Sequence, residues 1–494
     1  MITLGIDCGT QSLKTVALDG DSGQILASAS KPYGLIEGLP AGHAEQDPQI
    51  WWDALRETVG KVLSDLGSRK SEVGGIGISG QQHGFVPLDA NHQVIRPAKL
   101  WCDTSTTAQC DEIRAKLGGR EKTIALAGND ILPGFTAPKI LWLKQNEPAN
   151  FAKLAHVALP HDFLNLRLTG ALRMEFGDAS GSALMDVRSR SWSRPVCDAI
   201  DQDLFSKLPP LASSLEPVGT LLPALAEEWG LSSKVVVSAG GGDNMMAAIG
   251  TGNTKPGVVT ASLGTSGTIF ACCDKPVIDP QGEIAAFCDS ADHWMPLLCT
   301  MNVTVATEAF RNLFGWDHTR MDAEISSVPP GADGLLFLPY LQGERTPNLP
   351  HGCGVLHGMT ISNLTPAHMA RAAMEGVTLG MAYGLRRMES LGLKPSEIRL
   401  TGGGSQSPVW RQILADVFGY PVVTMQSAEG AALGAAIQAL HAATPGSSLD
   451  ALAAHCSPVR LGSRLESKRA DFYKGLLDQQ NALREKTQPK PPNF

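Results

Sequence analysis

A glycine-rich segment that ends in a carboxylate, Ser238-Ala239-Gly240-Gly241-Gly242-Asp243-Asn244, offers the clearest chemistry in this chain. It follows the β-branched residues 235–237 and precedes an apolar helical pattern over 245–249. Glycines let a backbone approach a bulky anion, and the first turn of a helix presents free N–H groups to a phosphate. A carboxylate would repel that phosphate, so we interpret Asp243 as the base that meets an attacking hydroxyl. The alternative is that Asp243 only caps the helix.

The same strand–turn–strand pattern opens both halves of the chain. Residues 4–18 place a Gly9-Thr10 turn between two apolar runs, and residues 258–270 repeat the pattern around Gly264-Thr265. Hairpin turns are rich in Gly and Thr for conformational reasons alone, so one such turn says little. Two of them, one opening each half, predict an internal repeat: two similar domains that face each other across a cleft.

The two copies of this repeat differ at one position. Asp7 in the first copy corresponds to Ser262 in the second, so only one hairpin carries a carboxylate. Mg²⁺ prefers one or two carboxylates together with phosphate oxygens and water. The asymmetry therefore fits a single metal ion at one side of a shared phosphate site.

Two further glycine clusters have different interpretations. The segment 401–405 follows a strand pattern over 398–400 and precedes Ser407-Pro408, a cap and first turn of a helix expected over 409–418. A glycine loop at this point can admit a nucleotide base or its α-phosphate. Residues 75–80 satisfy GxGxxG, but their isoleucines alternate as in a strand and no helix pattern follows, so we reject a dinucleotide fingerprint. No GxxxxGK[ST] occurs either, which excludes the usual P-loop.

Composition narrows the class of protein. The chain has 494 residues and a formal net charge of -8, with no basic stripe to indicate nucleic acid or an anionic membrane. No apolar run reaches the ~20 residues of a membrane span, and residues 1–6 begin as a strand rather than a signal peptide. The 10 cysteines are scattered without a zinc-binding spacing. We expect a cytoplasmic protein that binds neither nucleic acid nor membrane.

Together these motifs resemble the FGGY family of carbohydrate kinases, over residue 2 to about residue 440. The matching segments are 5–10, 45–48, 80–84, 134–142, 177–181, 241–244, 262–267, 338–347, 354–359 and 368–375. The resemblance implies an α/β protein with the actin-like ATPase (ribonuclease H-like) fold, in which two similar domains enclose a nucleotide cleft. The expected divisions are 1–247 with the sugar site and the Mg²⁺/phosphate hairpin, 254–440 with the nucleotide site, and 441–494 as a linker, C-terminal helices and a frayed tail.

The resemblance also implies roles for individual residues. Asp243 is expected to be the catalytic base, ionised at pH 7 because the reference pKa of Asp is ~3.9. Asp7 is expected to hold Mg²⁺ through water, although it is also the competing candidate base. The remaining residues expected to bind ATP lie on the two turns, the nearby strand and the third glycine cluster: Gly9, Thr10, Gln11, Ser12, Lys14, Gly264, Thr265, Gly403, Gly404 and Ser407.

The sugar pocket is expected beside Asp243, around Gln82-His83, with Trp101 and Asp103 nearby. A buried histidine next to glycine is more often a core residue than a ligand, so this assignment depends on the resemblance. Gln82 stands where methionine is common in the family and Cys102 where asparagine is frequent. These departures change the hydrogen bonding at the pocket wall.

The activity implied is ATP-dependent phosphorylation of a ketopentose, D-xylulose first among them. The expected partners are the sugar and ATP, with a homodimer suggested by other family members. A kinase for another sugar, such as a ribulose or gluconate, is the nearest alternative. The remote alternative is an actin-like ATP-binding protein without enzymatic activity, although no appended substrate-binding or DNA-binding segment is visible.

Overall fold

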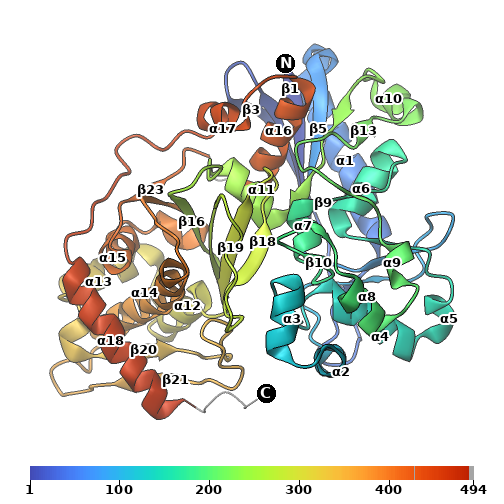
Figure 1. The fold of residues 1–494 in the computed structure, drawn as a ribbon. Coiled ribbons are helices and arrows are strands. Elements are labelled where there is room, and N and C mark those ends of the chain that lie inside the picture. The colour runs from blue at the N-terminus through green and yellow to red at the C-terminus, as the bar shows by residue number, and fades with distance from the viewer. Residues whose placement is uncertain (428, 489–494) are drawn as a thin grey trace.

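Two central β-sheets, one in each half of the chain, organise the molecule in a computed structural model that describes residues 1–427 and 429–488 (Figure 1). Helices cover both sheets, and the two halves meet along a central region that contains α11 (Asp243–Gly250) and α16 (Gly430–Ala443). This two-domain α/β architecture confirms the fold predicted from the internal repeat.

The first sheet has the order β13-β14-β5-β1-β2-β3, with β15 also paired to β5. β1 and β2 form the predicted hairpin, and β5 lies parallel to β1 on its other side. The strands are β1 (Ile2–Cys8), β2 (Ser12–Asp19), β3 (Gln24–Pro32), β5 (Val73–Gly80), β13 (Gly219–Thr220), β14 (Val236–Val237) and β15 (Gly241–Gly242). The rejected GxGxxG motif lies entirely on β5, as its alternating isoleucines predict.

The second sheet, of order β18-β19-β17-β16-β22-β23, repeats this scheme. β16 and β17 form an antiparallel hairpin, and β22 lies parallel to β16 as β5 does to β1. Asp7 faces Ser79 on β5, and Ser262 faces Thr401 on β22, so these two positions correspond. The strands are β16 (Val258–Leu263), β17 (Gly267–Ala271), β18 (Ala285–Cys288), β19 (Trp294–Thr300), β22 (Glu397–Thr401) and β23 (Val422–Thr424).

Five two-stranded sheets and the flanking helices complete the fold. The short pairs are β4 (Glu45–Gln46) with β7 (Ala98–Lys99), β6 (Val86–Leu88) with β8 (His156–Ala158), β9 (Met174–Glu175) with β12 (Leu211–Ala212), β10 (Met185–Asp186) with β11 (Ser191–Trp192), and β20 (Leu336–Pro339) with β21 (Gly354–His357). The helices before α11 are α1 (Pro48–Leu66), α2 (Thr107–Leu117), α3 (Arg120–Ala127), α4 (Thr136–Asn146), α5 (Pro148–Phe151), α6 (Pro160–Thr169), α7 (Phe176–Ser180), α8 (Arg194–Ile200), α9 (Leu204–Lys207) and α10 (Pro223–Trp229). Those after it include α12 (Thr304–Leu313), α13 (His318–Ser327), α14 (Pro366–Ser390), α15 (Pro408–Phe418), α17 (Leu449–Cys456) and α18 (Ala470–Thr487).

Local sequence signals explain where several helices begin. The Asp47 side chain accepts a hydrogen bond from the backbone N–H of Gln49 at the start of α1, where Pro48 holds the first helical position. Ser407 caps α15 in the same way, and Gly419 ends that helix in the left-handed conformation. α18 continues through Thr487, and the rest of the tail predicted to fray, 489–494, lies outside the described residues.

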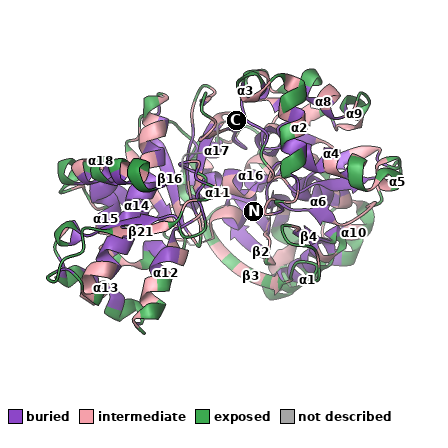
Figure 2. Cartoon of the chain, turned by 90° about the horizontal axis from the view of Figure 1, so that it is seen from below, coloured by how far each residue is buried: buried purple, intermediate pink, exposed green. Residues whose placement is uncertain are grey.

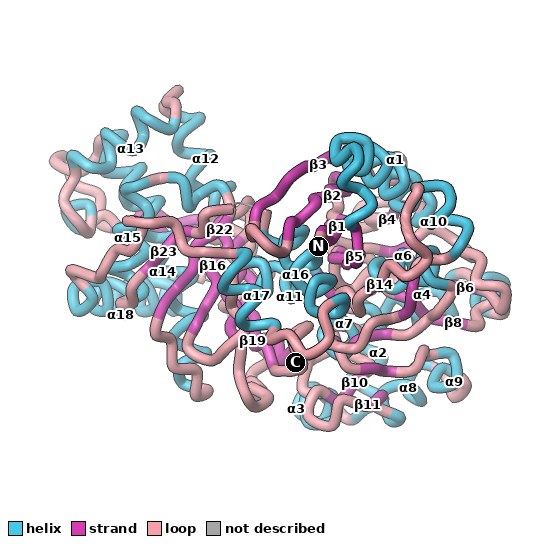
Figure 3. The backbone as a smooth tube through the Cα atoms, turned by 90° about the horizontal axis from the view of Figure 1, so that it is seen from above, coloured by secondary structure: helices cyan, strands magenta, loops and turns pink. Residues whose placement is uncertain are grey.

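α16 packs directly on α11 and on the first sheet because glycines occupy the points where the backbones approach most closely. A methyl group on Gly434 would lie 1.8 Å from the carbonyl oxygen of Met246 on α11, and one on Gly250 would lie 1.8 Å from that of Gly430. On the other side, a methyl group on Gly5 of β1 would lie 1.9 Å from the carbonyl oxygen of Ala432. Figure 3 shows the two helices side by side between the sheets.

The buried core follows this arrangement. One hydrophobic cluster lies in each half, around β1 and β5 in the first and around α14 in the second. A third cluster joins the halves, because Phe85 and Ile140 of the first half share it with Phe287 and Leu297 of the second. Figure 2 shows buried residues through the middle of both halves. In the described part of the chain, no helix is both long and apolar enough to span a membrane.

The α11–α16 contact predicts a large effect of one methyl group. Gly434→Ala should lower the free energy of unfolding by about 3 kcal/mol, because the methyl group can fit only if the helices separate. Gly60→Ala is the matched control, since its methyl group meets open space on the exposed face of α1 and should leave stability equal or slightly higher. Urea unfolding measures both variants. Equal midpoints for the two would contradict the close contact.

Candidate active site

Asp243 lies where a strand of the first sheet ends and α11 begins. β15 pairs in parallel with the end of β5, and α11 starts at the next residue. A methyl group on Gly241 would lie 2.1 Å from Oγ of Ser290, and one on Gly242 would lie 2.6 Å from Cγ of Gln82. The missing side chains of these glycines therefore make room for neighbouring protein atoms, whereas the sequence alone suggests an approach to an anion.

Hydrogen bonds hold the carboxyl group of Asp243 through one of its two oxygens. Its Oδ1 accepts hydrogen bonds from the backbone N–H and from Nδ2 of Asn244, at 2.8 and 3.0 Å. Its Oδ2 accepts no hydrogen bond from any residue that the structure describes. Burial, with repulsion from Asp7 and Asp178, raises the pKa of Asp243 to about 7, although Asn244 opposes the shift. The prediction of an ionised Asp243 at pH 7 is therefore wrong for this structure, because the half-buried carboxyl group lies near two other carboxyl groups that disfavour its charge.

Asp7, at the end of β1, is the second carboxyl group of the site. Ser79 Oγ donates a hydrogen bond of 2.8 Å to its Oδ1. Burial and the nearby Glu429 raise the pKa of Asp7, while Ser79 and Lys14 oppose that shift. The ammonium group of Lys14 forms an ion pair with Glu429. Both charged groups therefore lie near the carboxyl group of Asp7.

The turn that follows Asp7 is fixed through its carbonyl oxygens. Tyr33 Oη donates to the carbonyl of Gly9 and Gln46 Nε2 to that of Thr10, both at 2.7 Å. Ser12, the first residue of β2, accepts from the N–H of Gly9. Within the described chain the N–H groups of Thr10 and Gln11 donate no hydrogen bond. Free N–H groups in a turn suit a phosphate oxygen.

The corresponding turn of the second half has the same organisation. The N–H of Thr304, at the start of α12, donates to the carbonyl of Gly264 at 3.0 Å, and that of Val303 to the carbonyl of Thr265 at 3.1 Å. No partner among the described residues accepts from the N–H groups of Thr265 and Ser266. The turn therefore also keeps N–H groups for an anion.

Gln82 connects the base to the predicted sugar pocket. Its Oε1 accepts a hydrogen bond of 2.9 Å from Nδ2 of Asn244. Its buried Nε2 has no acceptor among the residues that the structure describes. A buried donor without a partner costs free energy, so this position is suited to a ligand oxygen such as a hydroxyl. Asn244 also contacts Thr268 of β17, at 3.4 Å, which extends the chain of contacts to the second half.

His83 is held in a left-handed backbone conformation, with φ at 65°. Its carbonyl oxygen accepts hydrogen bonds from the buried Lys139 Nζ at 2.8 Å and from Thr136 Oγ1 at 3.2 Å. Its ring packs between Phe135 and Phe287, with centroids 4.8 and 5.7 Å away. Burial and the Lys139 ammonium lower the pKa of His83 to about 3, so the imidazole is neutral at pH 7. A neutral imidazole can both donate and accept a hydrogen bond.

Trp101 and Asp103 support the pocket in different ways. Trp101 Nε1 donates a hydrogen bond of 2.9 Å to Oγ1 of Thr10, which connects the predicted sugar wall to the first turn. Asp103 is fully buried, and its oxygens accept from Lys99 Nζ at 2.9 Å, from Ala44 N–H and from Ser105. The structure therefore brings Trp101 to the phosphate turn but leaves Asp103 behind the pocket wall.

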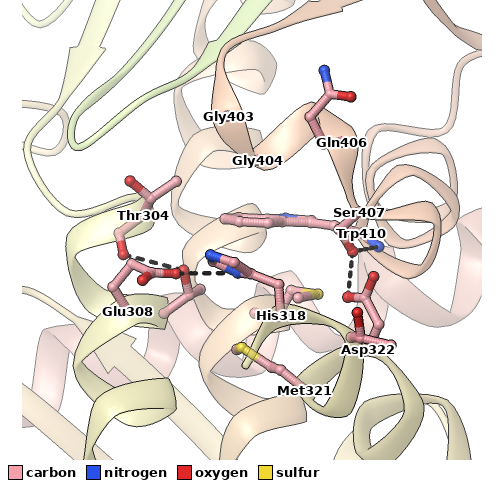
Figure 4. Close-up of a pocket in the computed structure, with 13 residues that line it drawn as sticks. Thr304, Glu308, His318, Met321, Asp322, Gly403, Gly404, Gln406, Ser407 and Trp410 are labelled. Atoms are coloured by element: carbon pink, nitrogen blue, oxygen red, sulfur yellow. Dashed lines mark hydrogen bonds and ion pairs between the residues drawn. The ribbon is translucent and has the colours of Figure 1, made fainter. Parts of the chain in front are cut away.

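A cavity of about 570 Å³ lies in the second half, beside the third glycine cluster (Figure 4). This volume is within the range of small-molecule sites. Gly403 and Gly404 form one wall, and Ser407 donates a hydrogen bond of 2.6 Å to Asp322 while capping α15. Thr304 lines the same cavity and contacts Gly264, so the cavity continues toward the second turn.

Sequence reasoning missed most of this cavity. The missed lining residues include Thr304, Glu308, His318, Asp322 and Trp410, which come from three helices. The signal available in the sequence was Trp410. It lies three positions after the predicted cap Ser407, on the helix that follows the glycine cluster. Gly404 has room only for a hydrogen there, since a methyl group would lie 2.9 Å from the Trp410 ring.

Comparison with known proteins identifies a family. Models of the FGGY family of carbohydrate kinases match residues 2–250 with the N-terminal domain and 259–443 with the C-terminal domain. A xylulose kinase of Haemophilus influenzae is 42% identical over 445 residues, 89% of this chain and 90% of that protein. A xylulose kinase of Escherichia coli is 36% identical over 450 residues, 90% and 91% of the two chains. The crystal structure of xylulose kinase from Rhodospirillum rubrum matches with a TM-score of 0.91 at 28% identity, over 98% of this chain and 99% of that one.

The raised pKa of Asp243 predicts a pH-dependent stability change. The unfolded state loses this proton near pH 3.8 and the folded state near 7, so the charge destabilises the fold progressively as pH rises between these values and fully above 7. Asp243→Asn should therefore stabilise the protein at pH 8, by about 2–4 kcal/mol, and this gain should vanish toward pH 4.

Urea unfolding of Asp243→Asn and of the wild type at several pH values measures this gain. Asp478→Asn, at an exposed position of α18, controls for simple loss of a charge and should change stability little at any pH. A gain that is absent at pH 8, or the same at pH 4 and pH 8, would contradict the assigned environment of Asp243.

Proposed function

This chain belongs to the FGGY family of carbohydrate kinases, and from that membership we propose that it transfers the γ-phosphoryl group of ATP to a ketopentose, D-xylulose, to give D-xylulose 5-phosphate. The names of the relatives described above support this sugar. The single observation that carries the catalytic part is the placement of Asp243. This carboxyl group has a pKa near 7, is repelled by the carboxyl group of Asp7, and is linked to Gln82 through Asn244, while its Oδ2 has no hydrogen-bond donor among the described residues.

In the proposed reaction, Oδ2 of Asp243 accepts the proton of the sugar hydroxyl. The hydroxyl oxygen forms a bond to the γ-phosphorus while the bond to the β–γ bridging oxygen breaks, and ADP leaves. A base is most effective when its pKa is near the working pH, and the environment of Asp243 meets that condition. Asn244 orients the carboxyl group through Oδ1 and leaves the other oxygen toward the substrate.

The nucleotide is proposed to lie across both halves. Its base and ribose would occupy the cavity beside Gly403, Gly404 and Ser407, and its β- and γ-phosphates would contact the N–H groups of the two turns. The N–H groups of these turns that find no acceptor in the described part of the chain support this arrangement, because positioning and charge neutralisation carry most of phosphoryl-transfer catalysis. Lys14 would add positive charge close to the first turn.

The residues of the site also suit Mg²⁺. Asp7 provides an oxygen ligand whose charge is disfavoured by burial and by Glu429, so a nearby cation would stabilise its ionised form. We propose that Asp7 holds this ion, directly or through water. When bound, Mg²⁺ would supply positive charge to the phosphates.

Gln82 and His83 are proposed to contact the sugar, with Trp101 between them and the first turn and Asp103 supporting the pocket from behind its wall. The unpaired Nε2 of Gln82 and the neutral imidazole of His83 both suit hydroxyl groups.

We also propose a cytoplasmic location, supported by the free thiols of all ten cysteines. A homodimer is proposed from the family resemblance alone.

A panel of substrates tests the proposed function. Coupled ADP release with MgATP should show the highest kcat/KM for D-xylulose, compared with D- and L-ribulose, L-xylulose, gluconate, glycerol and a control without sugar. Preference for another sugar would overturn the assignment of D-xylulose while keeping the kinase, and would direct attention to Gln82 and Cys102. No sugar-dependent ADP release, with ATP still bound, would overturn the kinase assignment itself.

The proposed role of Asp243 predicts a loss of turnover without a loss of ATP binding. Asp243→Ala should fold and bind ATP normally, while kcat falls by about 10²–10⁴, the usual share of a general base. Steady-state kinetics and ATP binding measured on the same preparation separate these effects. Asp178→Asn is a poor control because it contacts His161, so Asp478→Asn on α18 is used and should keep wild-type kcat. Near-normal turnover of Asp243→Ala would show that another group is the base.

A further inference from the structure

A cluster of three potential metal ligands lies outside the site described above. One ligand atom from each of Cys272, Asp289 and His293, namely the thiol sulfur, a carboxylate oxygen and a ring nitrogen, lies within 4.8 Å of the other two. Cys272 directly follows β17, and the other two residues begin and end the turn that connects β18 to β19. We propose that these three side chains bind a Zn²⁺ ion.

The turn is folded so that its ligand atoms stay free. Oδ1 of Asp289 accepts hydrogen bonds from the N–H groups of Ala291 and His293, which leaves Oδ2 on the side of the cluster. The Nδ1 atom of His293 is buried and has no hydrogen-bond partner among the described residues. An unpaired buried nitrogen costs free energy, and a metal ion at that point would remove the cost.

The backbone brings the cysteine to the turn. Cys273 and Trp294 exchange backbone hydrogen bonds of 2.7 and 3.0 Å as an antiparallel pair, so Cys272 lies opposite Met295 and His293 is its diagonal neighbour on the same face. Oδ2 of Asp289 is 3.9 Å from Nδ1 of His293. Ligand atoms of a tetrahedral zinc site are roughly 3.5 Å apart, given Zn–N and Zn–O bonds of about 2.0–2.1 Å and a Zn–S bond of about 2.3 Å. Small side-chain rotations are enough to bring the Asp289 and His293 ligand atoms from 3.9 Å to that separation.

Contacts with the rest of the molecule hold the turn in place. Ser214 N–H donates to Oδ1 of Asp292 at 2.9 Å, and Arg190 donates to the carbonyl oxygens of Asp292 and His293. Gln438 of α16 donates to the carbonyl of Ser290 at 3.2 Å. The ligands are therefore positioned by both halves before any ion binds. The His293 side chain is 39% exposed, which gives an ion a route from solvent.

The only other such cluster among the described residues has a different explanation. His43, Glu45 and Asp103 also lie close together, but Lys99 Nζ is 3.1 Å from Glu45 and 2.9 Å from Asp103. It is also 3.3 Å from Nδ1 of His43. The ammonium group already supplies the positive charge there. Within the described chain Asp289 forms no ion pair with a Lys or an Arg, and His293 is its only ion-pair partner.

The ligand set favours zinc over the harder ions. Thiolate and imidazole ligands select Zn²⁺, whereas Mg²⁺ and Ca²⁺ require oxygen ligands. Binding forms the Zn–S bond as the Cys272 thiol releases its proton to solvent. Three protein ligands leave a fourth position for water. Because the turn contacts both halves, the bound ion would stabilise the junction between them rather than take part in phosphoryl transfer.

Metal titration of the full chain tests this proposal without reference to activity. After metal is removed with a chelator, Co²⁺ should bind one equivalent and produce a thiolate-to-cobalt charge-transfer absorption, and Zn²⁺ should displace it. Cys272→Ser should remove that absorption and weaken Zn²⁺ binding by about 100-fold or more, measured by competition with a chromophoric chelator. His293→Gln, at a partly exposed position, should weaken binding by at least about 10-fold.

Cys273→Ser is the matched control, because it removes the neighbouring thiol and keeps all three ligands. It should bind Zn²⁺ as the wild type does, and zinc should raise the melting temperature of both. The proposal is overturned if the wild type binds no equivalent of Zn²⁺, or if Cys272→Ser and His293→Gln bind it as tightly as the wild type. Should Cys272→Ser fail to fold by circular dichroism, His293→Gln alone decides.

Discussion

The direct contact of α16 with α11 is the constraint on which the rest of the structure depends. At Gly434 and Gly250 the two helices meet backbone to backbone, because a methyl group at either position would lie 1.8 Å from a carbonyl oxygen of the other helix. α11 carries Asp243 at its first position, and α16 lies against β1, which carries Asp7. The close contacts at Gly5, Gly250 and Gly434 therefore help to set the separation between the proposed base and the proposed metal ligand.

The site concentrates negative charge that the fold does not neutralise. Asp7, Asp178 and Asp243 all have raised pKa values, with burial as the main cause in each. Of the three, Asp178 alone forms an ion pair within the described chain: the imidazole of His161 lies 2.9 Å from it and 3.0 Å from Asp162. Burial opposes the charge on His161, yet these two carboxylates raise its pKa well above the usual value. The charge left over at Asp7 and Asp243 is a stability cost that suits a site built for a cation and a proton.

The sequence was sufficient to predict those elements whose structure is determined by residues close together in the chain. The two hairpins, the cap of α1 and the cap of α15 follow from residues within a few positions of one another, and the repeat indicated two similar halves. The cavity was not predictable in the same way, because α12, α13 and α15 bring its walls together from segments about 100 residues apart. The pKa of Asp243 was also missed, since it depends on burial and on Asp178, which no local pattern places nearby.

The position of α16 has a further consequence, for the order in which the chain becomes structured during synthesis. β1 and β5 leave one face uncovered until α16 is available, and 350 positions separate the end of β5 at Gly80 from the start of α16 at Gly430. At about 5–20 residues per second, a ribosome needs roughly 20–70 s to cover that distance. During this interval the glycine-lined face of the first sheet has no partner from its own chain. The first sheet therefore keeps this face accessible to solvent and to other chains until residues 430–443 have been synthesised.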